Sequence, residues 1–283
     1  MLRNTTWFVL ALLVSARAGA EPPKAGASAP KSPASQRSPL DVPRLARALE
    51  SGDEAEMVAA LEEIEARGRD GGPAAPLVNA LLLRGGSVRV MLAAFKAAAA
   101  LGKESSSEAV APYVLHRRPE IRQAAAEALV ATGGPAAAAA LRRALTSVDP
   151  KVRATAARGL GELGAKDAVS DLFVALGKEV PGAASSIASL CAPAECDRLM
   201  EYVGKLKFET LEPGFVPLLL RKELPSRNKL LYIDRLRRLA TKRSNSVLQT
   251  ALASLPPDGE PKLRAALQTA LQGRPVKVEE DQP

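Results

Sequence analysis

The stretch DPKVRATAARGLGELG, residues 149–164, has the marks of one helix with a defined start and end. Asp149 is a favourable N-cap, and Pro150 suits the first helical position because its missing N–H has no intrahelical partner there. Gly164 stands where a left-handed residue commonly ends a helix. Between these ends, apolar side chains recur at helical spacing and predict one buried face: Val152, Ala156, Leu160 and Leu163.

The same pattern recurs at intervals of 31 residues. RPEIRQAAAEALVATG, residues 118–133, is the clearest second copy, and residues 87–102 and 181–191 are weaker ones. A pair of helices joined by a tight turn and repeated at a fixed period is typical of a solenoid, in which each unit buries its apolar stripe against its neighbours. The shorter helix of each pair is predicted over residues 73–85, 108–116, 135–147 and 167–178.

Composition agrees with an all-helical chain. Only 3% of the 283 residues are aromatic, and the β-branched residues are too scattered to build a sheet. We therefore predict an all-α fold, an α-solenoid of stacked antiparallel helix pairs over residues 41–272, with the clearest repeats in 73–191. After Cys196 the motif fades, and helices are expected over 216–223, 227–240, 246–254 and 261–272.

The pattern Asp-Pro-x-Val-Arg-x-x-Ala-x-x-x-Leu-Gly-x-Leu-Gly resembles the short bacterial HEAT repeat, also called the PBS-lyase HEAT-like repeat. The resemblance implies a HEAT-like superhelix. In that family the Arg of each Val-Arg pair often meets an acidic residue of a neighbouring repeat. Arg122 and Arg153 match this position, whereas Met91 and Ala184 depart from it, so the resemblance implies only a partial ladder of charges.

The first 20 residues have the features of a secretory signal peptide cleaved after Ala20: a short polar start, an apolar run and an A-x-A site. The alternative is an uncleaved membrane anchor. The apolar run from Trp7 to Val14 is too short for that, because a span needs about 20 residues. We therefore predict an exported protein, periplasmic or secreted, with no stable membrane span in the mature chain.

Two further segments lie outside the predicted solenoid. Residues 21–40 are rich in Pro, Ala and Ser and predict a disordered tether, and residues 273–283 form a charged tail. Removal of the signal peptide lowers the net charge from +8 to +6, because Arg3 and Arg17 leave 37 basic against 31 acidic side chains. In an exported protein this excess points to acidic proteins, anionic glycans or membrane surfaces in place of nucleic acid.

The sequence offers no catalytic, cofactor or metal site, and we predict that the protein is not an enzyme. His116 is the only histidine, and its place in LHRRPE predicts a surface turn. Deoxyhypusine hydroxylases, a class of HEAT-repeat enzymes, hold iron with several His-Glu pairs that this chain lacks. The phycobilin lyases that gave the repeat its other name are cytosolic, which the export signal argues against. No glycine-rich nucleotide-binding motif is present.

Cys191 and Cys196, in CAPAEC, are the only cysteines. A zinc site needs more ligands than these two, and the spacing is not that of a redox C-x-x-C motif. In an oxidising compartment they predict a local disulfide with a structural role. The alternative is a pair of free thiols, with Cys191 buried.

Charge is distributed unevenly along the chain. Residues 41–70 carry nine acidic and four basic side chains, a net of −5, whereas residues 221–243 carry nine basic and two acidic, a net of +7. Arg235, Arg238 and Lys242 recur at i, i+3 and i+7 and predict a basic ridge. The buried side of that helix would be Leu231, Ile233, Leu236 and Leu239. The candidate partner-binding residues are Arg221, Lys222, Arg227, Lys229, Arg235, Arg238, Lys242 and Arg243.

Two interpretations of this ridge stay open: a solvated outer face that keeps the protein soluble, or a binding surface for an acidic protein. The leading hypothesis is a non-catalytic protein–protein interaction scaffold of the cell envelope, monomeric or weakly self-associating head to tail. One alternative is an accessory or regulatory subunit of an envelope enzyme, or a lyase-like HEAT enzyme. A minor alternative is binding of phosphate or nucleic acid through the basic C-terminal segment, against which the export signal argues.

Overall fold

The structure, a computed structural model, describes residues 39–256 and 259–278. The predicted signal peptide, almost all of the predicted tether and the last residues of the tail lie outside the described residues. The helices of the described residues all belong to the unit Leu40–Pro283. Among the described residues no strand forms, and Val203 and Leu206 make an isolated bridge.

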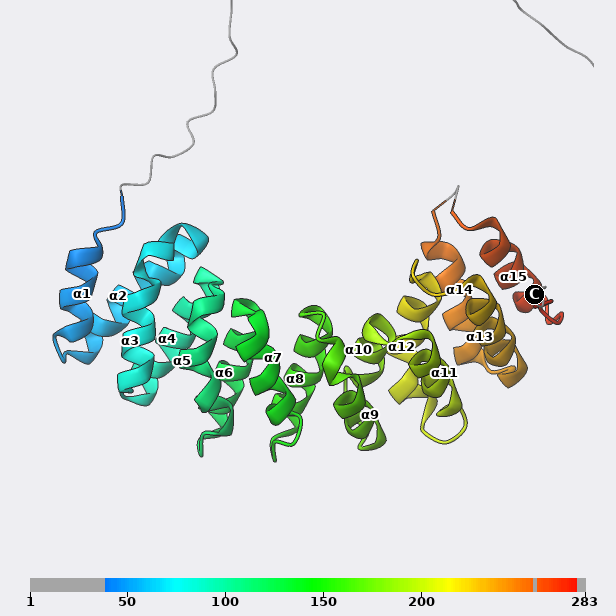
Figure 1. Ribbon diagram of the computed structural model, residues 1–283, viewed down its shortest axis with the longest axis horizontal. Coiled ribbons are helices and arrows are strands. Elements are labelled where there is room, and N and C mark those ends of the chain that lie inside the picture. The colour runs from blue at the N-terminus through cyan, green and yellow to red at the C-terminus, as the bar shows by residue number, and fades with distance from the viewer. Residues whose placement is uncertain (1–38, 257–258, 279–283) are drawn as a thin grey trace, which may run out of the picture. The chain divides into compact units, whose positions relative to one another are not determined.

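The helices pack in two rows (Figure 1). In the first, row A, each helix packs against the next member of the row, so that the row is continuous through the unit. Row A consists of α2 (Glu54–Arg67), α4 (Val88–Leu101), α6 (Pro119–Thr132), α8 (Pro150–Glu162), α10 (Ala183–Leu190), α12 (Phe208–Leu220) and α14 (Lys242–Ser254).

The second row, row B, alternates with row A along the chain, and nearly every member packs against the row A helix that follows it. Short 3-10 segments lead into three of its helices: η1 (Gly68–Ala74), η2 (Glu104–Ser106) and η4 (Lys166–Ala168). Row B consists of α1 (Val42–Glu50), α3 (Ala75–Arg84), α5 (Ser107–Val110) with η3 (Ala111–Leu115), α7 (Gly134–Ala144), α9 (Val169–Gly177), α11 (Pro193–Glu201), α13 (Ser226–Leu239) and α15 (Pro261–Leu271). This arrangement confirms the predicted α-solenoid of stacked helix pairs.

The helix at 149–164 forms as its sequence predicts. The Asp149 carboxylate accepts a hydrogen bond of 2.9 Å from the Lys151 N–H, and Pro150 is the first helical residue. Gly164 follows the helix with a positive φ of 67°. Of the predicted buried face, Leu163 is half-buried against the core, and three side chains are fully buried: Val152, Ala156 and Leu160.

Small residues allow the helices of row A to approach closely. A Cβ atom placed on Gly161 of α8 would lie 2.4 Å from Oγ of Ser186 on α10, and that hydroxyl donates to the Ala157 carbonyl at 2.8 Å. On α12, a Cβ atom on Gly214 would lie 2.7 Å from the backbone oxygen of Ala184. No side chain larger than hydrogen fits at these contacts without a shift, so glycine here sets the spacing between repeats.

The C-terminal helices agree with the prediction in three cases, α13, α14 and α15, and differ from it in two. The helix expected over 216–223 begins at Phe208 and ends at Leu220, and α11 was not predicted at all. Pro213 and Pro217 lie inside α12, where the sequence pattern treats proline as a helix breaker. Proline instead occupies the first turn of α11 as Pro193, a position where its missing N–H costs nothing.

The charge ladder implied by the family resemblance has one rung among the described residues. The Arg122 guanidinium lies 3.9 Å from the carboxylate of Asp149, which begins the next row A helix. Arg153 instead donates to the carbonyl oxygens of Ser147 and Val148, at 2.8 and 3.1 Å, in the turn before its own helix. The expected tie of Arg153 to a neighbouring repeat is therefore wrong, because the position of Asp149 is taken by Val180 one repeat later.

Candidate interaction surface

The basic segment 221–243 does not form one ridge. Helix α13 ends at Leu239, Ala240 takes a left-handed conformation with φ 50°, and Thr241 caps the next helix by accepting a hydrogen bond from the Ser244 N–H at 3.1 Å. Lys242 therefore begins a new helix and does not continue the line of Arg235. The prediction of a continuous i, i+3, i+7 ridge is wrong, because α13 ends and the chain turns before it reaches Lys242.

The buried side of α13 also differs in part. Ile233 and Leu236 are buried as predicted, and Leu239 is half-buried. Leu231, however, is 45% exposed. The buried face runs instead through Lys229, Tyr232, Ile233 and Leu236, at helical spacing.

Lys229 is not available to a partner. Its side chain is 2% exposed, and its ammonium lies 2.8 and 2.9 Å from the two carboxylate oxygens of Glu260, which precedes α15. This is an interior ion pair that ties α13 to the next helix. The prediction of Lys229 as a partner-binding residue is wrong, because a residue at helical spacing from buried neighbours shares their face.

Arg221 is occupied within the fold. Its guanidinium donates to the carbonyl oxygens of Ala188 and Cys191, at 3.2 and 2.7 Å, and so satisfies acceptors at the C-terminal end of α10. The sulfurs of Cys191 and Cys196 are bonded to each other beneath it, and both side chains are buried. Arg221 therefore supports the junction between α10 and α11 and is not a free cation for a partner.

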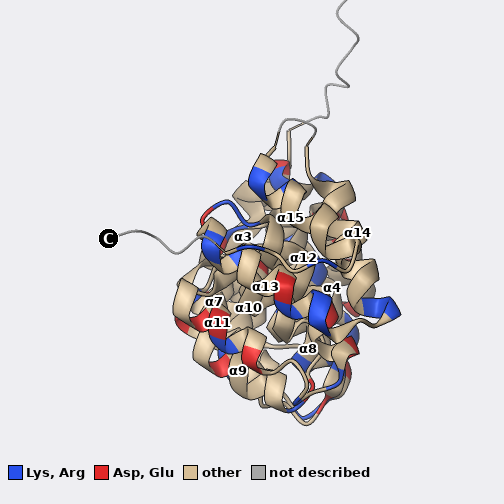
Figure 2. Ribbon diagram, turned by 90° about the vertical axis from the view of Figure 1, so that its right-hand side faces the viewer, with Lys and Arg blue, Asp and Glu red and all other residues tan. Residues whose placement is uncertain are grey.

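Two more cations have partners on the surface. Arg238 lies 2.7 Å from the carboxylate of Asp234, and Arg243 lies 3.3 and 3.1 Å from Glu209 and Glu212 of α12. Both side chains remain more than half exposed, so these ion pairs add little stability. They do reduce the positive charge that is available to a partner. Figure 2 views the molecule from its C-terminal end, and basic and acidic residues are interspersed on the helices seen there.

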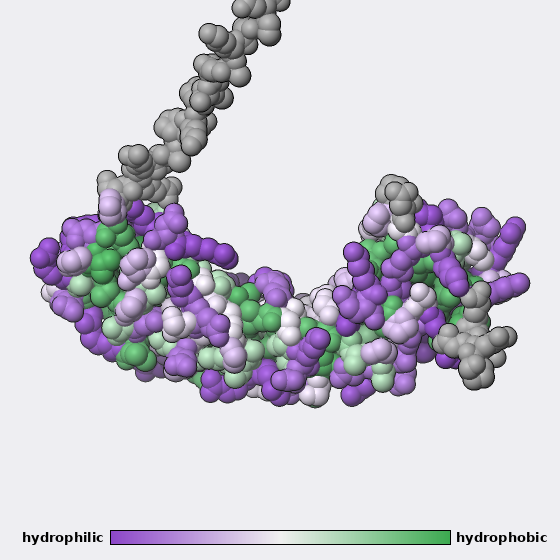
Figure 3. Space-filling view, turned by 45° about the horizontal axis from the view of Figure 1, so that its top comes forward, coloured by the Kyte–Doolittle hydropathy of each residue, from purple (hydrophilic) through white to green (hydrophobic). Residues whose placement is uncertain are grey.

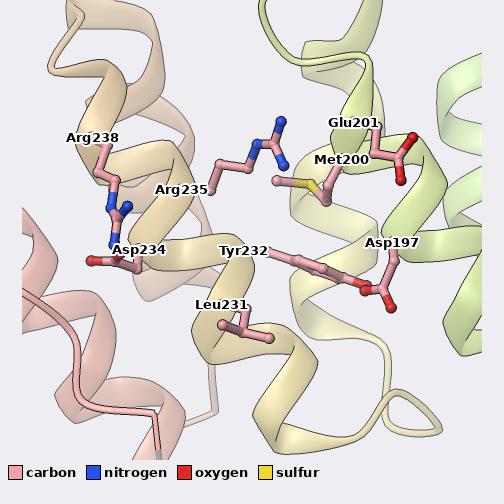
Figure 4. Close-up of a pocket in the computed structure, with 8 residues that line it drawn as sticks. All are labelled: Asp197, Met200, Glu201, Leu231, Tyr232, Asp234, Arg235 and Arg238. Carbon is pink, nitrogen blue, oxygen red and sulfur yellow. Dashed lines mark hydrogen bonds and ion pairs between the residues drawn. The ribbon is translucent and has the colours of Figure 1, made fainter.

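Four cations of the segment remain exposed, and no ion pair links them to any of the described residues: Lys222, Arg227, Arg235 and Lys242. Arg235 and Lys242 each line a cavity. The larger of these two cavities, about 510 Å³, lies between α11 and α13 (Figure 4). Its lining residues are Asp197, Met200, Glu201, Leu231, Tyr232, Asp234, Arg235 and Arg238.

One edge of this cavity is held rigid by hydrogen bonds between α11 and α13. The Tyr232 hydroxyl donates to the Asp197 carboxylate, and the Asn228 amide donates to the same carboxylate at 3.0 Å. Burial, and after it the hydrogen bond to Asp197, raises the pKa of Tyr232 well above its ordinary value, so this hydroxyl stays a donor at physiological pH. The cation–π contact of Arg198 with Phe173, 4.3 Å from the ring centroid, holds the other side of α11 against α9.

The mouth of the cavity combines apolar and charged groups. Arg235 extends from α13 toward α11, Met200 and Glu201 project from α11, and the exposed Leu231 lies beside the Tyr232 ring (Figure 4). Tyrosine, arginine and methionine at a partly apolar depression are the residue types enriched in protein–protein interfaces. This arrangement can hold a partner side chain.

Elsewhere, His116 lies in the turn before α6, as predicted. Its Nδ1 accepts a hydrogen bond of 3.2 Å from the Arg118 N–H. Within residues 39–256 and 259–278, no group of three or more His, Cys, Asp or Glu side chains could hold a metal ion. No helix in these same ranges has the length and apolar character needed to cross a membrane.

The α11 side of the cavity was not predicted from the sequence, because no helix was expected at residues 193–201. A signal was nevertheless present. Asp197 meets Asn228, Glu212 meets Arg243 and Lys229 meets Glu260, each at a separation of 31 residues, the period of the repeat. Equivalent positions of adjacent repeats lie side by side in a solenoid. The period therefore persists to the last helix after the motif has faded, and adding 31 to each residue number would have found these pairs.

The fold is a HEAT-like α-solenoid, and a helical-repeat surface of this kind supports a role in protein interaction. No protein-family model matches the chain, and no curated protein matches it in sequence. A similar solved structure is the complex of CpcE and CpcF of phycocyanin lyase from Nostoc, with 16% identity and a TM-score of 0.47 over 87% of this chain and 99% of that chain.

Two artificial proteins are also similar. An engineered protein has 20% identity and a TM-score of 0.41 over 83% of this chain and 96% of its own. A designed armadillo repeat protein has 16% identity and a TM-score of 0.40 over 82% of this chain and 99% of its own. At these values we draw nothing about function from the similarity, and the assignment of the fold depends on the contacts within this chain.

Proposed function

We propose that this protein is an exported, non-catalytic scaffold of the cell envelope that binds an acidic partner protein through its C-terminal helix pairs. The observation that carries the proposal is Arg235. It is exposed, without an ion pair to the described residues, and extends across a cavity whose walls include Leu231 and Met200. A guanidinium placed in this way can bind a carboxylate through two parallel hydrogen bonds, while the apolar walls exclude water around them.

The histidine and the cavity tyrosine also favour binding over catalysis. The Nδ1 atom of the single histidine accepts a hydrogen bond from the backbone N–H that precedes α6. The raised pKa of Tyr232 keeps the hydroxyl of the cavity protonated. Neither group is arranged to move a proton to or from a substrate. A rigid row of helix pairs that displays exposed side chains is instead suited to contacts spread over an extended partner.

Export is part of the proposal and depends on the first 20 residues of the sequence. In a bacterial host that exports the full chain, mature protein isolated from the periplasm or medium should begin at Glu21. Edman sequencing and intact mass will show this. A chain that keeps Met1 and stays in the cytosol would contradict the export proposal, and would bring nucleic acid back among the partners to test.

Binding can be tested without a known partner by selection from a peptide library displayed on phage. The wild-type solenoid should enrich peptides that carry Asp and Glu. An Arg235→Glu variant should bind the selected peptides about tenfold more weakly, because one charge-assisted contact becomes repulsive. Lys96→Glu on α4 is the matched control, since Lys96 is likewise exposed and unpaired among the described residues.

Both variants should melt as the wild type does, because neither side chain is buried. Equal affinity of the wild type and Arg235→Glu for the selected peptides would contradict the role of Arg235. Enrichment of peptides without acidic residues would contradict an acidic partner altogether.

A further inference from the structure

A second cavity lies where the chain passes from α13 to α14 and faces the connection between α11 and α12. Its volume is about 310 Å³. Its walls are almost entirely apolar, and Lys242 and Arg243 stand at its rim. The lining residues are Val203, Gly204, Leu206, Phe208, Leu211, Leu239, Thr241, Lys242 and Arg243.

The apolar side chains of this cavity are incompletely covered. Val203, Leu206, Phe208 and Leu239 are all half-buried against the core, whereas Leu211 is fully buried and forms the floor. Four partly exposed apolar side chains converging on one depression retain an unfavourable contact with water. Hydrophobic and hydrophilic residues are interspersed over the face of the solenoid shown in Figure 3.

The cavity is built from backbone that is held in place. The Lys205 and Leu206 N–H groups both donate to the Tyr202 carbonyl, at 2.9 and 3.1 Å, and the isolated bridge joins Val203 to Leu206. On the other side, Ala240 has a positive φ of 50°, a conformation that costs free energy for a residue with a Cβ atom. The hydrogen bonds of the 202–206 turn therefore fix one wall before any ligand arrives.

The charge at the rim is unequal. Arg243 is neutralised by Glu209 and Glu212, whereas no ion pair links Lys242 to any of the described residues. An apolar cavity with one unpaired cation at its edge complements a ligand in which an apolar group lies next to an anionic one.

We infer that this cavity binds one large apolar side chain of the partner protein, and that Lys242 binds a carboxylate adjacent to that side chain. The inference rests on the proposed function and names the partner's chemistry: an acidic segment with an embedded Phe, Leu or Met. The volume lies at the lower end of the range of ligand pockets, about 300–1,000 Å³, which suits a single side chain better than a large cofactor. The shallow, half-open walls suit an anchor presented by a partner's surface.

The test uses synthetic peptides, because changes in a peptide cannot unfold the protein. A fluorescent peptide with one Phe flanked by Asp and Glu is compared with a second in which Phe is replaced by Ala, and a third with Asn and Gln as the flanking residues. Fluorescence polarisation against the mature chain gives the three dissociation constants. Replacing Phe should weaken binding about tenfold, as expected for an anchor that fills an apolar pocket.

Two protein variants locate the effect. Leu206→Trp places a ring in the cavity and should bind the Phe and Ala peptides equally. Lys242→Glu should weaken the acidic Phe peptide about fivefold and leave the Asn and Gln peptide unchanged, because only the first carries the carboxylates. Circular dichroism melting confirms that each variant is folded. Because Lys242 is exposed, its variant remains informative even if Leu206→Trp does not fold.

Equal binding of the Phe and Ala peptides by the wild type would overturn the inference, as would a Phe effect that persists in Leu206→Trp. Competition by octanoate at concentrations below those of the peptide would overturn it too, since a free fatty acid would then be the better occupant. The Arg235→Glu variant separates the two proposals. If it binds the Phe peptide as the wild type does while the Lys242→Glu and Leu206→Trp effects remain, the cavity at α14 stands and the role of Arg235 fails.

Discussion

The repeats from α6 to α10 and the helices from α11 to α15 follow the same 31-residue period, but they are held together differently. In the first region, helix starts and packing follow the motif, with Asp149 capping α8 and Gly161 admitting Ser186. In the second, charged side chains in or near the interior join neighbouring repeats, such as Lys229 with Glu260. The difference shows that a solenoid can lose its motif and keep its register when side-chain contacts one period apart join its repeats.

This difference also decides what the basic segment can do. A net charge of +7 over residues 221–243 suggests a broad cationic surface, yet five of its nine basic side chains already have partners within the protein. Arg221 satisfies carbonyl groups of α10, and Lys229 is buried in an ion pair. The binding capacity is concentrated in a few cations beside cavities, of which Arg235 and Lys242 are the best placed.

The largest expected effect comes from breaking the interior ion pair of the second region. Glu260→Gln leaves the Lys229 ammonium, 2% exposed, without its counter-charge and should lower the free energy of unfolding by about 3 kcal/mol. Lys229→Met should cost about 1 kcal/mol or less, because the carboxylate left behind is one-third exposed and can be hydrated. Urea unfolding followed by circular dichroism measures both.

The double variant is the control for this asymmetry and should resemble Lys229→Met. Hydrogen exchange should show the loss in α13 and α15 and leave α6 to α8 protected, since stability in a solenoid is carried by neighbouring repeats. If Lys229→Met proves the more damaging change, the account of a buried lysine with a partly hydrated partner is wrong.

A second test concerns the close packing that joins the two regions at α10 and α12. Gly214→Ala places a Cβ atom 2.7 Å from the Ala184 carbonyl oxygen and should cost about 2 kcal/mol through overpacking. Gly177→Ala is the matched control at the end of α9, where nothing lies within 4 Å of the new atom. That change should leave the urea midpoint unchanged or slightly raised. Equal stability of the two variants would show that the spacing of row A does not depend on glycine at this contact.

The first region could be predicted from the sequence because its determinants are local. Asp149 and Pro150 act within a few residues of themselves, and the apolar residues at helical spacing reveal their common face within one helix. The helices of the second region could be predicted only in part. Proline marks the start of α11 at Pro193 but lies inside α12 at Pro217, and nothing in the residue type distinguishes the two uses.

The candidate site was harder to predict for a different reason. Whether a basic residue is free depends on what lies beside it in the neighbouring repeat. Arg221 has backbone carbonyl acceptors, which no side-chain pattern reveals, whereas Lys229 has a partner 31 residues onward, which the repeat period does reveal. The net charge of a segment therefore predicts a charged binding surface only after each residue has been checked for a partner one repeat period away.

The disulfide tests whether the junction between the two regions depends on covalent support. Cys191→Ala with Cys196→Ala should lower stability by about 1–2 kcal/mol, a modest loss because the loop closed between the two cysteines is short. In unreduced protein from an oxidising compartment, alkylation under denaturing conditions should label neither cysteine. Labelling of both without reductant would show free thiols, and the junction would then depend on packing and Arg221 alone.

The smallest expected effect is the pH dependence of Asp234, a buried carboxylate of the second region. Burial acts to raise its pKa, but hydrogen bonds from Arg237 and the Val276 N–H, with the charges of Arg237 and Arg238, lower the pKa on balance. Its stabilising contribution is therefore present above the ordinary Asp pKa of about 3.9 and is lost as pH falls through the lower folded value. Asp234→Asn should lower the free energy of unfolding by about 1 kcal/mol at pH 7, and its difference from the wild type should narrow below about pH 4.

The control is Asp171→Asn, which lies in an exposed ion pair of the first region and should change the urea midpoint little at any pH. A gap for Asp234→Asn that widens on acidification would mean that this carboxyl is protonated in the folded protein, and that Arg237 and Arg238 are held by other groups.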